Sequence, residues 1–537
     1  MNICPHCLTE IPDFAVNCSR CAETLPDDLV SSAEQGDTER IAGLLESGCQ
    51  VDARNSYGET ALCKASQQGR KDVAELLLNR GADINAANRF GVSPLMYAAE
   101  FGHLDIVKIL LERGSDVEAR TQPGGRTTLI VAAGWCASDE NCLSIVKLLL
   151  ENRADPNARG DDGITALINA AREGKSDVVR LLLEHGADLH MRDDLNDSAL
   201  LKAAAEGQSE VIEILCDHGA EVSSKDSHGW SPLMLASRQS NVDAVKILLD
   251  RGAEIDAKDD NGWTALMWAC SIGKAEVAKL LLERGSDPEA SDLYGATALM
   301  KAARGGHCGT VKMLLDLGVQ VNATDMNDLT ALIRAARIGS AEVVRALADA
   351  GADLGAADED GRTPLMIACA HGRIECARTL IQLGANVDAE DEYSGTALIH
   401  ACKGGHTALV KLLLDCGAKV HTADEMGRTP LIWASIGAGA AIDGDKGIRA
   451  PAKSTTELPE IIETLLNARA NPNSQDKNGS TALMEASARG FQKVVQILLE
   501  RGVSFNSANN AGLTALALAQ RAGHYHIAEI LKKFGDQ

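Results

Sequence analysis

Four cysteines near the start of the chain have the spacing of a metal site. Cys4 and Cys7 form one Cys-x-x-Cys step, and Cys18 and Cys21 form a second one, ten residues further along. Two such steps present four thiolates, which is the ligand set of a tetrahedral structural zinc ion. Because a segment of about 25 residues cannot bury a useful core, a metal would have to hold it together. The spacing predicts one structural Zn²⁺ bound by Cys4, Cys7, Cys18 and Cys21.

Two other interpretations of these cysteines are weaker. A redox dithiol needs one Cys-x-x-Cys beside a βαβ pattern, whereas here there are two copies and no such pattern. A nucleic-acid-binding tip needs basic residues around it, but residues 1–26 contain Arg20 as their single basic residue against three acidic ones. The segment resembles the short zinc ribbons of modular proteins, with Leu8 and Ala22 in place of the usual glycines.

The whole chain is long and acidic. It has 537 residues, a net charge of −24 and only 3% aromatic residues. This length exceeds one globular core, so the chain must hold several domains or an array of units. The negative charge argues against binding through phosphate contacts, so we expect neither nucleic acid nor a membrane surface as partner. No apolar run approaches the ~20 residues that cross a bilayer, and no signal peptide is evident.

The other cysteines suggest where the protein works. They are scattered singly and mostly lie in segments rich in Ala and Leu. Thiols placed in this way behave as small apolar side chains and do not form a disulfide framework. We therefore expect a reducing compartment, the cytoplasm. The oligomeric state stays open, with a monomer favoured.

Most of the remaining chain repeats with a period of 33 residues, as GWTALMWACSIGKAEVAKLLLERGSDPEASDLYG (262–295) and GRTPLMIACAHGRIECARTLIQLGANVDAEDEYS (361–394) show. The Thr of each unit can cap a short first helix. A small pair and a Gly follow, and a Leu-Leu pair belongs to a second helix. The next Gly supplies a left-handed stop, and Asp-x-x-Gly closes a turn. One unit cannot bury its apolar face alone, so the units must stack.

This pattern resembles the ankyrin-repeat family over residues 27–537. The resemblance implies an all-α fold: an ankyrin-repeat solenoid of about fifteen helix-turn-helix units with β-hairpin-like turns, preceded by the small zinc ribbon. The family usually has His after the TPL-like leucine, but here Met96, Met267 and Ile399 occupy that position, so apolar packing should replace its hydrogen bonds. The expected parts are the zinc ribbon (1–26), an N-terminal capping unit (27–58), the repeats (59–512) and a C-terminal capping unit (513–537).

Two insertions interrupt the period. Residues 134–142 add a short segment between the helices of the fourth unit, and residues 437–459 add a longer one to the thirteenth. The second insertion is rich in Gly and Ala, so we expect it to be mobile. Long loops on a rigid scaffold often carry function, although solenoids also tolerate silent insertions.

No catalytic pattern stands out. H-E-x-x-H and G-x-S-x-G do not occur, and the EGKS stretch at 173–176 lacks the first Gly of a phosphate-binding loop, which is Asn169 here. The histidines that follow a repeat Gly should be structural; they are His103, His307, His406 and His524. We expect no enzyme and no catalytic residues.

The resemblance places the variable positions of each unit mostly on a concave, ligand-facing side. Most large aromatic residues occupy these positions, and aromatic side chains are the usual anchors of protein interfaces. Trp230, Trp263 and Tyr294 come from consecutive units, so they should form one patch. The predicted partner-binding residues are Tyr57, Phe90, Trp135, Trp230, Trp263, Trp268, Tyr294, Glu359, Asp360, Glu392 and Tyr393.

Some of these residues have a plainer explanation. Trp268, like Trp433, could instead pack against the next unit. The extra acids at the turn tips either attract a basic partner or only aid solubility.

Three functions fit the sequence. The first is a non-catalytic scaffold that binds a protein or peptide, possibly one with a basic patch, on the concave surface. The second is a regulatory or adaptor subunit of an enzyme complex, recognised through the zinc ribbon. The third is a secreted bacterial effector, a group that uses ankyrin arrays. Deleting residues 1–26 separates the first two, because only the adaptor needs the ribbon for binding.

Overall fold

The computed structural model describes residues 2–3, 10–11, 26–437 and 457–535. Cys4, Cys7, Cys18 and Cys21 lie outside these residues, so the zinc site stays a prediction. Most of the insertion at 437–459 also lies outside them. The described chain divides into two compact units, Met1–Asp260 and Asn261–Gln537.

The first unit begins with two short antiparallel strands, β1 (Asn2–Ile3) and β2 (Glu10–Ile11), in which Asn2 pairs with Ile11. Its helices follow as consecutive pairs. They are α1 (Pro26–Gln35), α2 (Thr38–Glu46), α3 (Ala61–Gln67), α4 (Lys71–Asn79), α5 (Pro94–Glu100), α6 (Leu104–Glu112), α7 (Thr128–Trp135), α8 (Asp139–Glu151), α9 (Ala166–Arg172), α10 (Ser176–Glu184), α11 (Ala199–Glu206), α12 (Ser209–Asp217), α13 (Pro232–Gln239) and α14 (Val242–Asp250).

The second unit continues the same alternation of a first and a second helix. Its helices are α15 (Ala265–Ser271), α16 (Ala275–Glu283), α17 (Ala298–Gly305), α18 (Cys308–Asp316), α19 (Ala331–Ile338), α20 (Ala341–Asp349), α21 (Pro364–Ala370), α22 (Ile374–Gln382), α23 (Ala397–Gly404), α24 (Thr407–Asp415), α25 (Pro430–Ile436), α26 (Leu458–Asn467), α27 (Ala482–Arg489), α28 (Gln492–Glu500), α29 (Ala515–Arg521) and α30 (Tyr525–Gly535).

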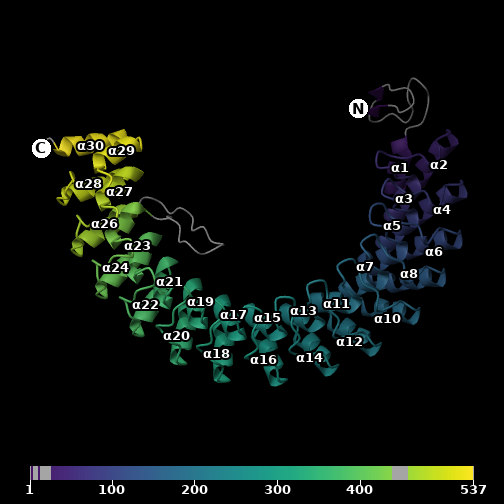
Figure 1. Cartoon of the computed structure of the whole chain (residues 1–537). Helices are drawn as coiled ribbons and strands as arrows, with labels where there is room; N and C mark the ends of the chain where they lie inside the picture. The colour runs from purple at the N-terminus through teal and green to yellow at the C-terminus, as the bar shows by residue number, and fades with distance from the viewer. Residues whose placement is uncertain (1, 4–9, 12–25, 438–456, 536–537) are drawn as a thin grey trace. The chain divides into compact units, whose positions relative to one another are not determined.

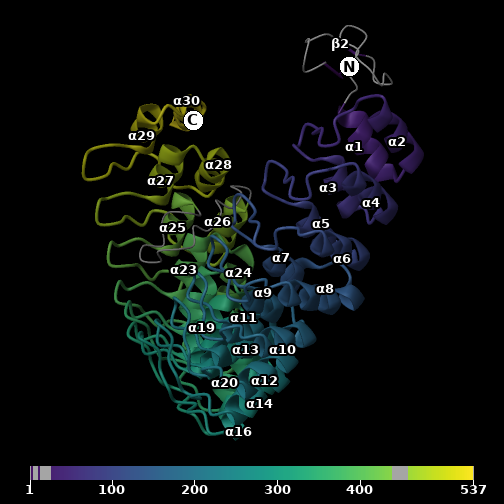
Figure 2. The same cartoon turned by 90° about the vertical axis from the view of Figure 1, so that its right-hand side faces the viewer.

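Within each unit, the odd-numbered first helices pack on one another in one layer and the even-numbered second helices pack in another (Figures 1 and 2). The described helices form fifteen such pairs, one for each repeat predicted from the sequence. Isolated bridges such as Ser291 to Thr297 close the turns before some first helices, which matches the expected hairpin-like turns. The predicted all-α solenoid is therefore the observed architecture after residue 26.

The first helices begin where the sequence predicts. The N–H of Met267 donates a hydrogen bond to Thr264 Oγ1 over 3.3 Å, and the N–H of Met96 donates to Ser93 Oγ over 3.2 Å. These caps satisfy backbone donors that the first turn of a helix leaves free. Met96, Met267 and Ile399 are buried, so apolar side chains fill the position where the family usually has histidine.

The Gly between the two helices of a repeat has two reasons to be Gly. Gly273 has a φ of +72°, in the left-handed region that Gly adopts without strain. A Cβ at Gly273 would also lie 2.5 Å from Nδ1 of His307, whose Nε2 lies 3.1 Å from the carbonyl oxygen of Ser271. His103 contacts the Gln67 carbonyl in the same way, over 2.9 Å. These contacts confirm the structural role predicted for both histidines.

The insertion at 134–142 does not form a loop. First helix α7 ends at Trp135, and α8 begins at Asp139 and runs for 13 residues, where second helices such as α10 have 9. Most of the added residues therefore extend a helix. The prediction of a segment between the helices is corrected here, because the extra residues continue the helical pattern of α8.

Candidate partner-binding surface

The turn tips are held from inside by a buried acidic side chain. Oδ1 of Asp292 accepts hydrogen bonds from the N–H of Tyr294 over 2.9 Å and of Ala296 over 2.8 Å. Asp391 does the same for Tyr393 and Gly395. The Asp is buried in each turn, whereas the tip residues after it are exposed. One Asp per tip is thus turn chemistry, as the sequence suggests.

Neighbouring tips are joined by single backbone hydrogen bonds. In the second unit, the N–H of Met326 donates to the carbonyl of Tyr294 over 2.9 Å, and the N–H of Glu425 donates to that of Tyr393 over 2.7 Å. In the first unit, the N–H of Gln122 donates to the carbonyl of Phe90 over 2.6 Å. These bonds fix the spacing between tips, so tip side chains are presented at regular intervals.

Four of the predicted residues are exposed on tips. The exposed fractions are 65% for Tyr57, 55% for Phe90, 64% for Tyr294 and 55% for Tyr393. Large apolar side chains are usually buried, so the exposed tip residues of each unit indicate an interaction surface on that unit. The sequence analysis missed the exposed aliphatic side chains of the tips, which lie one or two residues after the first Asp of their turn; they are Leu195 in the first unit and Leu293, Met326 and Met426 in the second.

The three predicted acids differ from one another. Glu359 and Glu392 are exposed on their tips. Asp360 is half-buried, and its Oδ2 lies 2.9 Å from an amino nitrogen of Arg362. Arg362 also pairs with the buried Asp358 over 2.9 Å. Two of the three acids thus extend from the surface without such a pair in the described contacts, while Asp360 belongs to a local ion-pair network.

The tryptophans lie less exposed than the tips. Trp263 and Trp268 are half-buried, with ring centroids 4.5 Å apart, and Lys301 Nζ lies 3.8 Å from the Trp263 ring centroid. Trp135 and Trp230 are also half-buried, with Arg126 4.5 Å and Arg238 5.4 Å from their respective ring centroids. Cations at these distances interact with the aromatic face.

The predicted patch of Trp230, Trp263 and Tyr294 combines residues of both units. Trp230 belongs to the first unit, and Trp263 and Tyr294 belong to the second. A single patch that includes all three stays a prediction.

One position that the sequence analysis assigned to the ligand-facing side is used inside the fold. It is the residue two after the TPL-like leucine. At this position Trp433 Nε1 donates to Asp424 Oδ2 over 2.8 Å, and His400 Nε2 lies 2.7 Å from Asp391 Oδ2. Both side chains are buried against the Asp of their own turn. The position varies in residue type because several donors can satisfy the same carboxylate.

Tyr97 occupies the same position and also reaches the preceding repeat. Its hydroxyl donates to Glu59 Oε1 over 2.8 Å and accepts from Asn88 Nδ2 over 2.9 Å. Burial, followed by the hydrogen bond to Glu59, raises the pKa of Tyr97 well above its usual value. Tyr97 and Trp433 are therefore core residues. Their aromatic character made them look like anchors in the sequence.

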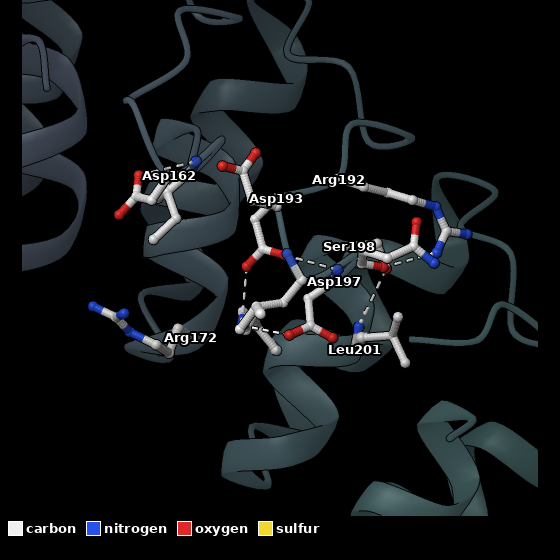
Figure 3. A network of polar contacts seen from close by, with 12 residues as sticks. Asp162, Arg172, Arg192, Asp193, Asp197, Ser198 and Leu201 are labelled. Atoms are coloured by element: carbon white, nitrogen blue, oxygen red, sulfur yellow. Dashed lines mark hydrogen bonds and ion pairs between the residues drawn. The ribbon is translucent and has the colours of Figure 1, made fainter. Parts of the chain in front are cut away.

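Figure 3 shows another contact between a side chain of a first helix and the acids of its own turn. It lies in the first unit, where Asp193 and Asp197 face the start of α11. Lys202 Nζ lies 3.0 Å from Asp193 Oδ2 and 2.5 Å from Asp197 Oδ2. The N–H of Leu201 donates to the capping Ser198 Oγ over 3.3 Å. Burial raises the pKa of Asp197 even though Lys202 opposes this shift. The carboxylates and the amine are mutually satisfied, so this cluster stabilises the turn and is no catalytic pair.

Other kinds of site were sought in the same residues. Among the residues that the structure describes, no group of His, Cys, Asp or Glu could hold a metal ion. None of the described helices combines the length and the apolar character needed to cross a membrane.

The comparison with protein families agrees with this architecture. The family model for ankyrin repeats (3 copies) matches residues 29–121, 129–226, 186–259, 233–325, 322–391, 384–441 and 452–536. Among solved structures, the crystal structure of the human ASB11 ankyrin repeat domain is 25% identical, with a TM-score of 0.39 over 42% of this chain and 99% of that chain. No curated protein matches the sequence. Because the family model matches most of the chain, the protein belongs to the ankyrin-repeat family.

Proposed function

We propose that this protein is a non-catalytic scaffold that binds a protein or peptide partner on its turn tips and neighbouring first helices. Ankyrin repeats bind protein partners, and the ankyrin-repeat fold is typically a non-catalytic interaction domain. The observation that carries the finer proposal is the set of exposed apolar tip side chains of the second unit, whose neighbouring tips are joined by backbone hydrogen bonds. A preorganised surface loses little conformational freedom on binding, which favours affinity.

The tips also suggest how a partner approaches. The exposed carboxylates of Glu359 and Glu392 lie on the same row as Tyr393 and Met426. Acidic groups at the rim of an interface attract a partner with basic groups and speed its association. We propose that the apolar tips hold the partner and that the acids guide it.

Location and metal content stay proposals as well. The described cysteines are free thiols and most are buried, which supports a reducing compartment such as the cytoplasm. The N-terminal cysteine spacing supports a structural zinc ion.

The proposal is tested by capturing partners from a lysate of the source cells with the full chain. Replacing Tyr294 and Tyr393 with Ala should weaken capture by about 2 kcal/mol or more, as loss of interface anchors does. Tyr525 is the matched control, because it is 71% exposed but lies in the terminal helix α30, away from the tips. Equal capture by the tip variant, the Tyr525→Ala variant and the unchanged chain would overturn the proposal.

A further inference from the structure

Two cysteines lie together in the short insertion of the first unit. Cys136 directly follows the last residue of α7, and Cys142 is the fourth residue of α8, so both belong to the segment 134–142 that interrupts the 33-residue period. Both side chains are buried, with exposed fractions of 6% and 3%. The scaffold function proposed above uses neither of them.

Hydrogen bonds hold the two thiols next to each other. The side chains of Cys136 and Cys142 share a hydrogen bond. Sγ of Cys136 also lies 3.5 Å from the carbonyl oxygen of Ser138, and Sγ of Cys142 lies 3.3 Å from that of Ala132. Each thiol can therefore donate to a carbonyl group, which favours the protonated form of the pair.

A cation from the next repeat touches this pair. Nζ of Lys175 lies 3.6 Å from Sγ of Cys142, and the two residues are 33 positions apart, which is one repeat period. Lys175 follows the Gly between its two helices, as His103 does, but His103 contacts the Gln67 carbonyl instead. An ammonium group beside a sulfur stabilises the thiolate, which is the form that reacts with oxidants.

The surroundings of Cys142 act on its proton in opposite directions. The hydrogen bond with Cys136, followed by burial, raises the pKa of the Cys142 thiol, and Lys175 opposes this rise. The Cys142 thiol is therefore mainly protonated at neutral pH, and it reacts more slowly than an activated catalytic cysteine does. Such a pair stays reduced in a reducing compartment and changes only when an oxidant is supplied.

The segment that carries the pair is fixed to the preceding repeat. The N–H of Ala137 donates to the carbonyl of Glu100 over 2.7 Å, and Nδ2 of Asn141 donates to that of Gly102 over 2.9 Å. Both contacts lie between the two cysteines in the sequence, so the folded repeat holds the thiols together. Sulfurs held in this way need only a small movement to reach the ~2.05 Å of a disulfide bond.

We propose that Cys136 and Cys142 are a site of reversible oxidation, and that they form an intramolecular disulfide bond when the protein meets a peroxide. The thiolate of one cysteine attacks an oxygen of H₂O₂, the O–O bond breaks, and the hydroxide that leaves takes up a proton to become water.

The second thiol completes the reaction. It attacks the sulfur of the resulting sulfenic acid and loses its proton, the S–O bond breaks, and a second water leaves. The two sulfurs give up two electrons in total, and the peroxide accepts them. A dithiol reductant breaks the disulfide bond by exchange and restores both thiols.

Peroxide treatment of the folded full chain tests the proposal, followed by alkylation in denaturant, trypsin digestion and mass spectrometry. Both cysteines lie in one tryptic peptide, residues 127–147. We expect this peptide to lose two hydrogen atoms and to carry no alkyl group, and reduction before alkylation should restore both thiols. Cys63 is the control in the same chain, because it is also buried and its Sγ lies 3.1 Å from the carbonyl oxygen of Ala86. Cys63 should stay a free thiol.

The contribution of Lys175 is measured by the rate of disulfide formation. Lys175→Gln should slow it several-fold because the ammonium group is lost, and Lys175→Arg should restore it because the charge is kept. Lys274→Gln is the matched control, because Lys274 also follows a repeat Gly, precedes a second helix and is half-buried. In the Cys142→Ser variant, the disulfide within peptide 127–147 should not form.

Two alkylated cysteines in peptide 127–147, under conditions that oxidise the exposed Cys416, would overturn the inference. A disulfide that joins this peptide to the same peptide of a second chain would overturn it too, and so would an equal loss of free thiol at Cys63. Equal rates for Lys175→Gln, Lys274→Gln and the unchanged chain would overturn the role assigned to Lys175.

Discussion

Trp263 shows how a side chain that resembles an interface anchor can also belong to the fold. Its ring packs on Trp268, and the amine of Lys301 lies over its face. Tyr294, on the next tip, is instead 64% exposed. Aromatic pairs contribute about 0.5–1.5 kcal/mol beyond their buried area, and a cation over a ring contributes about 0.5–1 kcal/mol more. The two residues should therefore respond differently to the same truncation.

Replacing Trp263 with Ala should lower the free energy of unfolding by about 1–2 kcal/mol, because it removes both contacts. The Tyr294→Ala variant is the control and should stay within about 0.5 kcal/mol of the unchanged chain. Urea unfolding followed by circular dichroism measures both. Equal stabilities of the two variants would show that the contacts of Trp263 add nothing to the fold.

At the scale of one repeat, the turn Asp and the first helix form a unit. Burial raises the pKa of Asp391, but hydrogen bonds from His400 and from the N–H groups of Gly395 and Tyr393 outweigh it, so the pKa lies below its ordinary value of 3.8. A carboxyl group with a lowered pKa contributes stability that is complete above its ordinary pKa and is lost as the pH falls through the folded value.

The Asp391→Asn variant should therefore be less stable than the unchanged chain at pH 6, and this difference should shrink below about pH 4. Urea unfolding at pH 6, 4.5 and 3.5 measures the change. Glu359→Gln is the control, because Glu359 is an exposed acid on a neighbouring tip. The difference in stability between the Asp391 variant and the unchanged chain could instead stay constant with pH. That result would show that the charge of the Asp391 carboxylate does not stabilise the fold.

Substitutions of the Gly between the two helices of a repeat can measure how closely adjacent repeats pack. Gly273 and Gly285 both have a positive φ, of +72° and +91°, but only at Gly273 does a neighbouring ring fill the space a Cβ would need. Gly285→Ala should show the cost of left-handed backbone alone, about 1–2 kcal/mol. Gly273→Ala should cost about 1–3 kcal/mol more, because the ring of His307 must move.

A double variant separates the two terms. Combining Gly273→Ala with His307→Ala should cost less than the sum of the two single changes, because the clash disappears with the ring. Thermal unfolding of the four proteins measures the coupling. Additive effects would mean that the His307 ring does not press on this Gly.

At the scale of the whole molecule, the chain joins a repeat array to an N-terminal segment for which the sequence predicts a different source of stability. The repeats are stabilised by contacts with their neighbours, as in other solenoids. The N-terminal segment is predicted to depend on a bound metal. In small folds, structural zinc contributes roughly 10–16 kcal/mol to the free energy of folding.

Purified protein should contain one zinc ion per chain, and the Cys4→Ser, Cys18→Ser double variant should contain none. Elemental analysis by mass spectrometry measures both. Chelation should leave the helical circular dichroism of the repeats almost unchanged, because repeats are stabilised by contacts with neighbouring repeats. Metal retained by the double variant would refute the ligand set.

The sequence by itself determined the repeat, the two helices of each unit, the Thr caps of the first helices and the Asp-x-x-Gly turns. These features depend on neighbouring residues, so a local pattern is enough to predict them. Thr264 and Met267, for example, are three residues apart, and the cap between them follows from the Thr that begins the helix.

The tertiary structure decided which variable side chains remain available to a partner. The hydroxyl of Tyr97 donates to Glu59, 38 residues earlier, in the preceding repeat. The short insertion became a longer α8. Each outcome depends on what the adjacent repeat presents, and a residue's own sequence neighbourhood does not contain that information. Stacking thus made Tyr97 part of the core and left Tyr294 at the surface.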